Sequence, residues 1–419
     1  MTGDMVFSRA YSFGWFGADA RLTNATQTSR RTKITWTYYY NVINACNLII
    51  DTAGGTDSEP DNATNKLYFA VAKTVRAHSY FNLVTLFAHN YAEAKDKKAL
   101  PIYDTQSDTY AAPQTVDSVY NFILHDLDGA ITAYTNALNE SVEPSDISMP
   151  DISVAYTVQA YVYLQKGDYA QAEAAAAKAI SSSKKTMLSG DGLVWGFNTI
   201  SNDNWMWGID ITGSTTGEVA GFWSMIDYFT YGYQSIGDYK VANSDLFNAI
   251  PTTDGRRKWF TYFGDTDMTR LMPANKFYDA DRVPMGDADW TNDVHFMRIE
   301  EPYMIAAEAA ARQNDLTTAC QYLGAMLSGR DTEKAAAITG MTQDELLEEI
   351  YFNWRLEFWG EGKSLLTLKR FEKSMTRPEN DYYKSLTAGG AIPYNDALLK
   401  FAIPQKERQN NPLLSTVEE

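Results

Sequence analysis

The chain has 419 residues, of which 45% are hydrophobic and 21% are charged, as in a globular protein with a sizeable core. No apolar run approaches the roughly 18 to 20 residues that cross a bilayer. The formal net charge of -17 argues against partners such as nucleic acid or anionic lipid surfaces. The 27 tyrosines exceed what a core requires, and aromatic faces with polar edges suit stacking on sugars.

The chain begins with MTGDMVFSRAYSFGWFG, which has neither the basic start nor the apolar segment of a signal peptide. This stretch is typical of a loop, so we expect a native targeting signal that the sequence does not include. Its rings and charges suit a sugar, and the candidate ligand-binding residues are Tyr11, Trp15, Asp4 and Arg9. Two alternatives remain open, because loop rings can anchor their own loop and the two charges can form an ordinary surface pair.

Four pairs of helices are predicted, near residues 66–137, 154–182, 298–328 and 342–371. The second pair reads AYTVQAYVYLQKGDYAQAEAAAAKAI, and small residues recur in it where antiparallel helices must approach closely, at Ala160, Ala172 and Ala179. This pattern is typical of a tetratricopeptide (TPR) repeat. The last pair begins at Thr342, whose spacing from Glu345 predicts a capping box.

Residues 186–297 differ in composition from the helical segments and are rich in Gly, Asn, Asp, Thr and aromatic residues. Within them, NWMWGIDI (204–211) alternates like a strand. We therefore predict a mainly α fold in one domain, residues 1–419, in which an α-helical scaffold carries a large irregular, loop-rich insert. Long irregular segments of compact proteins are usually functional, which places the ligand side on the insert.

Inside the insert, GFWSMIDYFTYGYQSIGDY (221–239) supplies three further candidate ligand-binding residues, Trp223, Tyr228 and Tyr231. Trp223 lies close to Gly221 in a predicted loop, so we expect its ring to be exposed, although such a ring can also anchor its loop. Five tryptophans on predicted helices or in the strand-like run are expected in the core, namely Trp36, Trp205, Trp207, Trp354 and Trp359.

Motifs for catalysis or metal binding are missing from the sequence. The four histidines have no metal-ligand spacing, and neither a phosphate loop nor a nucleophile elbow occurs. Carboxylates in GDTDM (264–268) and DADR (279–282) have a spacing that could hold calcium, but solvated turns are the alternative. A glycoside hydrolase needs two facing carboxylates, and nothing singles out such a pair. We predict that the protein is not an enzyme and needs no cofactor, and a glycoside hydrolase stays open as an alternative.

Several stretches, in this order along the chain, resemble the SusD/RagB family of surface glycan-binding lipoproteins. WTYYYNVINACNLI (36–49) resembles its W-x-x-x-Y-x-x-I-x-x-x-N helix, and VRAHSYFNLVTLFAHNY (75–91) its first TPR helix. MRIEEPYMIAAEAAARQND (297–315) resembles its R-x-x-E-x-Y-x-x-x-A-E-A segment, and FAIPQKERQNNPLL (401–414) its closing motif. WRLEFWGEGKSLLTLKRF (354–371) resembles its R-x-E-L-x-x-E-G motif, with departures at Asn353, Trp354, Ser364 and Thr367.

The resemblance implies a SusD-like fold and non-catalytic binding of oligosaccharide or polysaccharide. It implies a place on the outer membrane, exposed at the cell surface and held by a lipid anchor that this chain lacks. The partner it implies is a SusC-like TonB-dependent transporter, which would import the glycan. Two alternatives stay open, a RagB-like component for peptide uptake and a TPR-type protein-interaction scaffold.

The stretch at 354–371 places Arg355, Glu357 and Glu361 among large apolar residues, on a helix broken at Gly360 and Gly362. A guanidinium can hold two carboxylates, and partly buried charges need such partners. We therefore expect these three residues to form a structural ion-pair junction rather than a catalytic site.

Overall fold

The computed structural model describes residues 3–10, 17–107, 109–215, 221–260, 269–286, 291–388 and 390–416. The chain divides into two compact units, each built from three separate stretches. The insert unit comprises Met1–Arg21, Lys185–Glu300 and Asn314–Tyr394, and the helical unit comprises Leu22–Lys184, Glu301–Gln313 and Asn395–Glu419.

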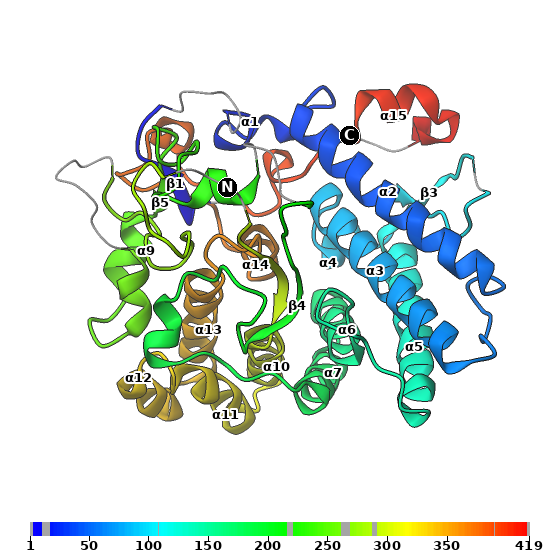
Figure 1. Cartoon of the computed structure of the whole chain (residues 1–419). Coiled ribbons are helices and arrows are strands. Elements are labelled where there is room, and N and C mark those ends of the chain that lie inside the picture. The colour runs from blue at the N-terminus through cyan, green and yellow to red at the C-terminus, as the bar shows by residue number, and fades with distance from the viewer. Residues whose placement is uncertain are drawn as a thin grey trace. The chain divides into compact units, whose positions relative to one another are not determined.

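Long helices dominate the helical unit: α2 (Arg30–Thr52), α3 (Ala63–Phe87), α5 (Val116–Asn139), α6 (Ile152–Lys166) and α7 (Tyr169–Ser182). Helix α3 packs against α2 and α5, and α6 packs against α5 and α7 (Figure 1). Side chains of Asn62, Thr115, Asp151 and Asp168 cap the starts of α3, α5, α6 and α7 by accepting backbone N–H groups.

Small residues and glycine set the geometry of α6 and α7. Ala160, Ala172 and Ala179 are fully buried, which lets backbones approach closely. Gly167 ends α6 with a φ of 78°, a left-handed conformation that favours glycine. The unit also contains α4 (Tyr91–Ala94), the antiparallel strands β2 (Lys98–Pro101) and β3 (Pro113–Thr115), and α15 (Gln405–Asn410).

Helix α10 (Glu300–Arg312) belongs to the helical unit from Glu301 onward, where the Tyr161 hydroxyl donates to the Glu301 carboxylate over 2.7 Å. The next helix, α11 (Leu316–Leu327), belongs to the insert unit. The division into four TPR-like pairs within one domain stays a prediction.

Two short antiparallel ribbons organise the insert unit. Strand β1 (Met5–Phe7) pairs with β5 (Lys240–Ala242), and β4 (Trp205–Ile209) pairs with β6 (Val294–Arg298). Its helices are α1 (Gly17–Ala20), α8 (Phe222–Ile226), α9 (Ser244–Ala249), α11, α12 (Thr332–Ala337), α13 (Gln343–Glu357) and α14 (Ser364–Arg370). Short 3-10 turns in the two units span Thr23–Ala25, Gly190–Val194, Gly255–Trp259, Ile338–Gly340, Lys384–Thr387, Ala397–Leu399 and Pro412–Thr416.

The structure confirms several local predictions. The described chain is mainly helical, and the strand predicted at 204–211 is β4. Thr342 and Glu345 form the predicted capping box at the start of α13. The helix at 354–371 is broken as expected, with Gly360 and Gly362 at positive φ between α13 and α14. All five tryptophans predicted in the core are buried. Among the described residues, no helix is both long and apolar enough to cross a membrane.

Candidate ligand-binding site

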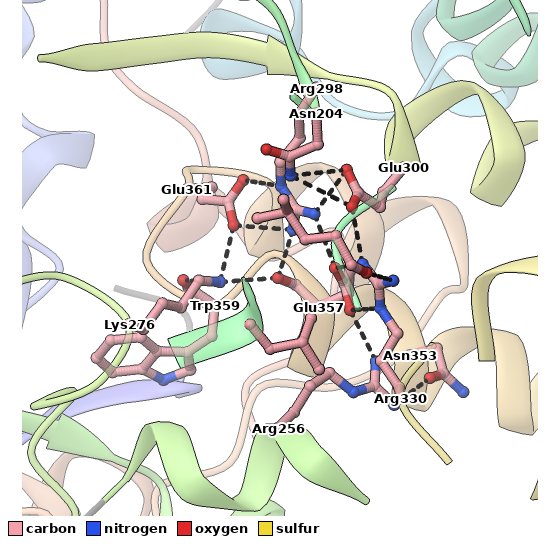
Figure 2. A network of polar contacts seen from close by, with 12 residues as sticks. Asn204, Arg256, Lys276, Arg298, Glu300, Arg330, Asn353, Glu357, Trp359 and Glu361 are labelled. Atoms are coloured by element: carbon pink, nitrogen blue, oxygen red, sulfur yellow. Dashed lines mark hydrogen bonds and ion pairs between the residues drawn. The ribbon is translucent and has the colours of Figure 1, made fainter. Parts of the chain in front are cut away.

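A network of buried charges links several segments of the insert unit (Figure 2). It joins the end of β6 to the end of α13, and it takes further side chains from positions 254, 256, 276 and 330. The cations of Arg256, Lys276, Arg298 and Arg330 meet the carboxylates of Asp254, Glu300, Glu357 and Glu361. The opposite charges balance, which offsets part of the cost of removing them from water.

Arg298 holds the network together with its planar guanidinium. Its Nη1 lies 2.7 Å from Oε1 of Glu357 and 3.0 Å from Oε2 of Glu300. Its Nε and Nη2 donate to the two carboxylate oxygens of Glu361 over 2.8 and 3.0 Å. Such paired, charge-assisted hydrogen bonds are among the strongest in proteins, and they fix α13 and the following loop against β6.

Glu357 is the carboxylate with the most cationic neighbours. Burial alone would raise its pKa, but the guanidinium groups of Arg330, Arg298 and Arg256 hold the pKa of Glu357 well below its usual range. Arg256 also donates to the Asn353 side chain over 2.8 Å. The residue at 353 therefore has a defined role here, although it departs from the family motif.

Glu361 connects the network to a pocket. Burial would raise its pKa, but the charges of Arg298 and Lys276 and a 3.0 Å contact with His295 Nε2 hold the pKa of Glu361 well below its usual range. Lys276 lies 2.7 Å from Glu361, and burial lowers the pKa of Lys276 to about 8. A carboxyl held in the ionised form cannot serve as the general acid of a glycosidase, which needs a raised pKa.

The prediction that Arg355 forms an ion-pair junction with Glu357 and Glu361 is wrong for Arg355. Glu357 and Glu361 do share a junction, but its central cation is Arg298. Arg355 pairs with Asp4 instead, Nη2 to Oδ1 over 2.7 Å. Residues two apart on a helix do not face each other, so Arg355 points away from Glu357.

The pocket beside Glu361 has a volume of about 210 Å³, which is below the roughly 300–1,000 Å³ of most ligand sites. Its walls are mostly aromatic, and its lining residues are Phe197, Phe222, Trp223, Phe277, Asp293, Val294, His295, Phe296, Gly360, Glu361 and Lys363. The Phe222 ring packs edge-on against the rings of Trp223 and Phe277, both at 5.3 Å between centroids. Rings around a few fixed polar groups are the usual arrangement of a small-molecule site.

Two of the rings that line this pocket are partly exposed. Phe222 is 38% exposed and Phe296 is 37% exposed. Trp195 is 69% exposed, but it is not among the residues that line the pocket. The Phe222 and Phe296 rings can therefore offer faces to a ligand that enters the pocket.

The candidate residues of the insert differ in exposure. Trp223 lines the pocket but is only 5% exposed, so the expectation of an exposed ring is wrong. It is the second residue of α8 and packs on Phe222 and Phe277, which explains its burial. Tyr228 is half-buried beside Phe229, and Tyr231 is exposed. The pocket lining includes neither tyrosine.

The N-terminal candidates are placed differently. Asp4 is buried and holds Arg355 and the Ser364 hydroxyl, so its carboxylate supports α13 and α14 from inside. Arg9 lies 5.8 Å from the centre of the Tyr239 ring rather than against Asp4. Tyr11 and Trp15 lie outside the described residues, so their role in binding stays a prediction.

Sequence reasoning missed Trp195, Phe222 and Phe296 as exposed rings. Trp195 sits between Gly190 and Gly196, both at positive φ, and this glycine-flanked tryptophan was the available signal. Phe222 is adjacent to Trp223, and the prediction of an exposed ring was assigned to Trp223 instead. Phe296 lies on β6 between inward-facing residues, where strand alternation turns it outward.

Metal binding gains no support in the described parts of the chain, which contain no group of three or more His, Cys, Asp or Glu side chains placed to hold an ion. Asp279, a calcium candidate, accepts hydrogen bonds from the Asp281 backbone and the Asn292 side chain, as in a turn. The other calcium candidate, 264–268, lies outside the described residues.

Two family models match the sequence. The model described as the SusD family matches residues 223–416, and the model described as "Starch-binding associating with outer membrane" matches residues 3–164. A comparison with curated proteins finds no match.

Solved structures resemble the whole chain. A SusD-like carbohydrate binding protein from Bacteroides vulgatus is 21% identical, with a TM-score of 0.82 over 100% of this chain and 90% of its own. A SusD superfamily protein from Bacteroides thetaiotaomicron is 20% identical, with a TM-score of 0.81 over 100% of this chain and 93% of its own. Another from Bacteroides fragilis is 20% identical, with a TM-score of 0.80, covering 99% and 90%. These similarities confirm the predicted SusD-like fold.

Proposed function

Because the chain belongs to the SusD/RagB family, we propose that it binds oligosaccharide or polysaccharide at the bacterial cell surface and delivers it to a SusC-like TonB-dependent transporter. Members of this family are non-catalytic binding proteins, so the prediction that the protein is not an enzyme is confirmed.

The observation that best supports a sugar ligand is the pocket of the insert unit. Its rings, with Phe222 and Phe296 partly exposed, can stack on pyranose faces, and His295 and Lys363 add polar groups at fixed positions. The buried charge network below holds β6 and the 357–361 segment in place, so the pocket is formed before a ligand arrives. A preformed site loses less entropy on binding.

The family supports both the ligand class and the location. One matching family model names starch binding and association with the outer membrane, and a similar structure is named as carbohydrate binding. Attachment through a lipid and delivery to a transporter are proposed from the family alone.

Calorimetric titration of the whole chain with a panel of soluble polysaccharides tests the ligand class. We expect at least one glycan to bind, with no release of reducing ends during the titration. If no polysaccharide or derived oligosaccharide binds at millimolar concentration, the proposed ligand class is wrong.

The transporter partner needs a separate test. The tagged protein, expressed in its native host, is purified from detergent-solubilised outer membranes. We expect a TonB-dependent transporter in near-equal amount. Recovery of the protein from these membranes without any such transporter would contradict the proposed delivery step.

A further inference from the structure

We propose that the helical unit carries a second ligand-binding site, specific for an uncharged sugar, in a pocket lined by α2, residues 103–105, residues 109–110 and α15. This inference rests on the proposed function only in taking sugars as the ligand class. The pocket has a volume of about 670 Å³, which lies within the roughly 300–1,000 Å³ of ligand sites. It contains none of the residues that line the pocket of the insert unit.

Its floor is rigid and its polar groups are already paired. The Tyr40 hydroxyl donates to the Pro101 carbonyl over 2.9 Å, and the Tyr40 ring packs 4.7 Å from that of Trp36. The Asn47 amide donates to the Tyr103 carbonyl over 3.0 Å, while its oxygen accepts from Arg76 over 2.8 Å. These contacts fix the floor before a ligand binds.

The rim is polar and its side chains are available. Thr37, Asn41 and Asn44 follow each other at helical spacing along one face of α2, and Gln409 and Asn410 come from α15. All five are exposed, and within the described part of the chain none of their side chains has a hydrogen-bond partner. Each carboxamide offers an acceptor and two donors, which matches the neighbouring hydroxyls of a sugar ring.

A ring and a carboxylate complete the chemistry. Tyr110 lines the pocket and is 56% exposed, so its face can stack on a sugar. Among the described lining residues, Glu407 is the only charged one. Burial raises the pKa of Glu407, against hydrogen bonds from Asn411 and Trp36 that lower it. The described lining residues include no cation, so acidic sugars find no counter-charge among them and a neutral sugar fits best.

A peptide is the competing occupant, since carboxamides can also bind a peptide backbone. Peptide recognition in grooves generally relies on apolar cavities for side chains. Among the described lining residues, the apolar ones besides three tyrosines are only Trp36 and Ile43, and both are buried in the floor. The observations therefore favour a sugar.

The test is calorimetric titration of the whole chain with three neutral trisaccharides, maltotriose, cellotriose and mannotriose, and with trialanine. The variants are Tyr110→Ala, the double variant Asn41→Ala/Asn44→Ala, and Phe222→Ala for the insert pocket. Tyr38→Ala is the matched control, because Tyr38 lies on α2 with the same 56% exposure but does not line the pocket. Circular dichroism checks that each variant is folded.

We expect a trisaccharide to bind at two equivalents per chain. In Tyr110→Ala and in the double variant, one of the two sites should bind at least about tenfold more weakly. In Tyr38→Ala, both sites should bind as in the wild type. If the wild type binds only one equivalent and Tyr110→Ala alone abolishes this binding, the second site is supported and the insert pocket is contradicted. A single equivalent lost only in Phe222→Ala would overturn the second site and leave the proposed function standing. Trialanine bound through Tyr110 in place of any sugar would overturn it, and no binding at millimolar sugar would contradict both proposals.

Discussion

Arg355 and Asp4 form an ion pair although 351 positions separate them in the chain, with Nη2 2.7 Å from Oδ1. Asp4 also accepts from the Ser364 hydroxyl, and its backbone carbonyl accepts from the Trp359 indole over 2.8 Å. The N-terminal strand β1 is therefore fastened to α13, to α14 and to the loop between them. This contact belongs to the stability of the insert unit rather than to its pocket.

The variant Arg355→Ala should consequently destabilise the protein without weakening glycan binding. It leaves the buried Asp4 carboxylate without its cation, and because Arg355 is partly exposed we expect a loss of roughly 1–3 kcal/mol in the free energy of unfolding. Urea unfolding measures the loss, and titration with a bound glycan measures affinity. Reduced affinity in a protein of unchanged stability would place Arg355 in the binding site instead.

Glu357→Gln should be the most damaging single substitution in the charge network. It removes the negative charge that Arg256, Arg298 and Arg330 share, and breaking a buried pair costs roughly 3–5 kcal/mol. Glu348→Gln on the same helix is the control, because Glu348 is exposed and pairs with Lys373 at the surface, a contact worth about 0–1 kcal/mol. Equal unfolding midpoints for the two variants would show that the network does not stabilise the fold.

Lys240 should make stability depend on pH. Burial lowers the pKa of Lys240 to about 7 in the folded chain, against 10.5 when unfolded. Between these values the unfolded chain keeps a proton that the folded chain has released, so the free energy of unfolding rises with pH. Below about pH 7 both states are charged, and the folded state bears the full cost of a buried charge.

Lys240→Met should therefore raise the melting temperature at about pH 6 and have a smaller effect at about pH 9. The exposed Lys384→Met serves as the control and should change neither value by much. Thermal unfolding across this pH range measures both variants. A melting temperature that falls equally at the two pH values would mean that the contacts of Lys240 matter more than its buried charge.

Local signals in the sequence were sufficient to predict where helices of the fold begin and break. The Thr342–Glu345 capping box and the glycines at 360 and 362 act within a few residues, so their effect is readable without the tertiary structure. The charge network could be predicted from the sequence only in part. Glu357 and Glu361 stood out as charges among apolar residues, but their partner Arg298 lies about sixty positions earlier, and only the fold brings it near.

Exposure of individual rings was the least predictable property. Trp223 and Phe222 are adjacent in the sequence, yet the tryptophan is buried and the phenylalanine lies at the pocket surface. Which ring turns inward depends on the start of α8 and on the position of Phe277, and neither follows from local composition.

The most direct measurement is calorimetric titration of the wild type, Phe222→Ala and Phe296→Ala with the polysaccharide that the wild type binds most tightly. Tyr382→Ala is the control, since Tyr382 is an exposed ring of the same unit that does not line the pocket. Loss of a stacking ring should weaken binding about tenfold in the first two variants, and the control should bind like the wild type. Unchanged affinity in both Phe222→Ala and Phe296→Ala would contradict glycan binding at the insert pocket.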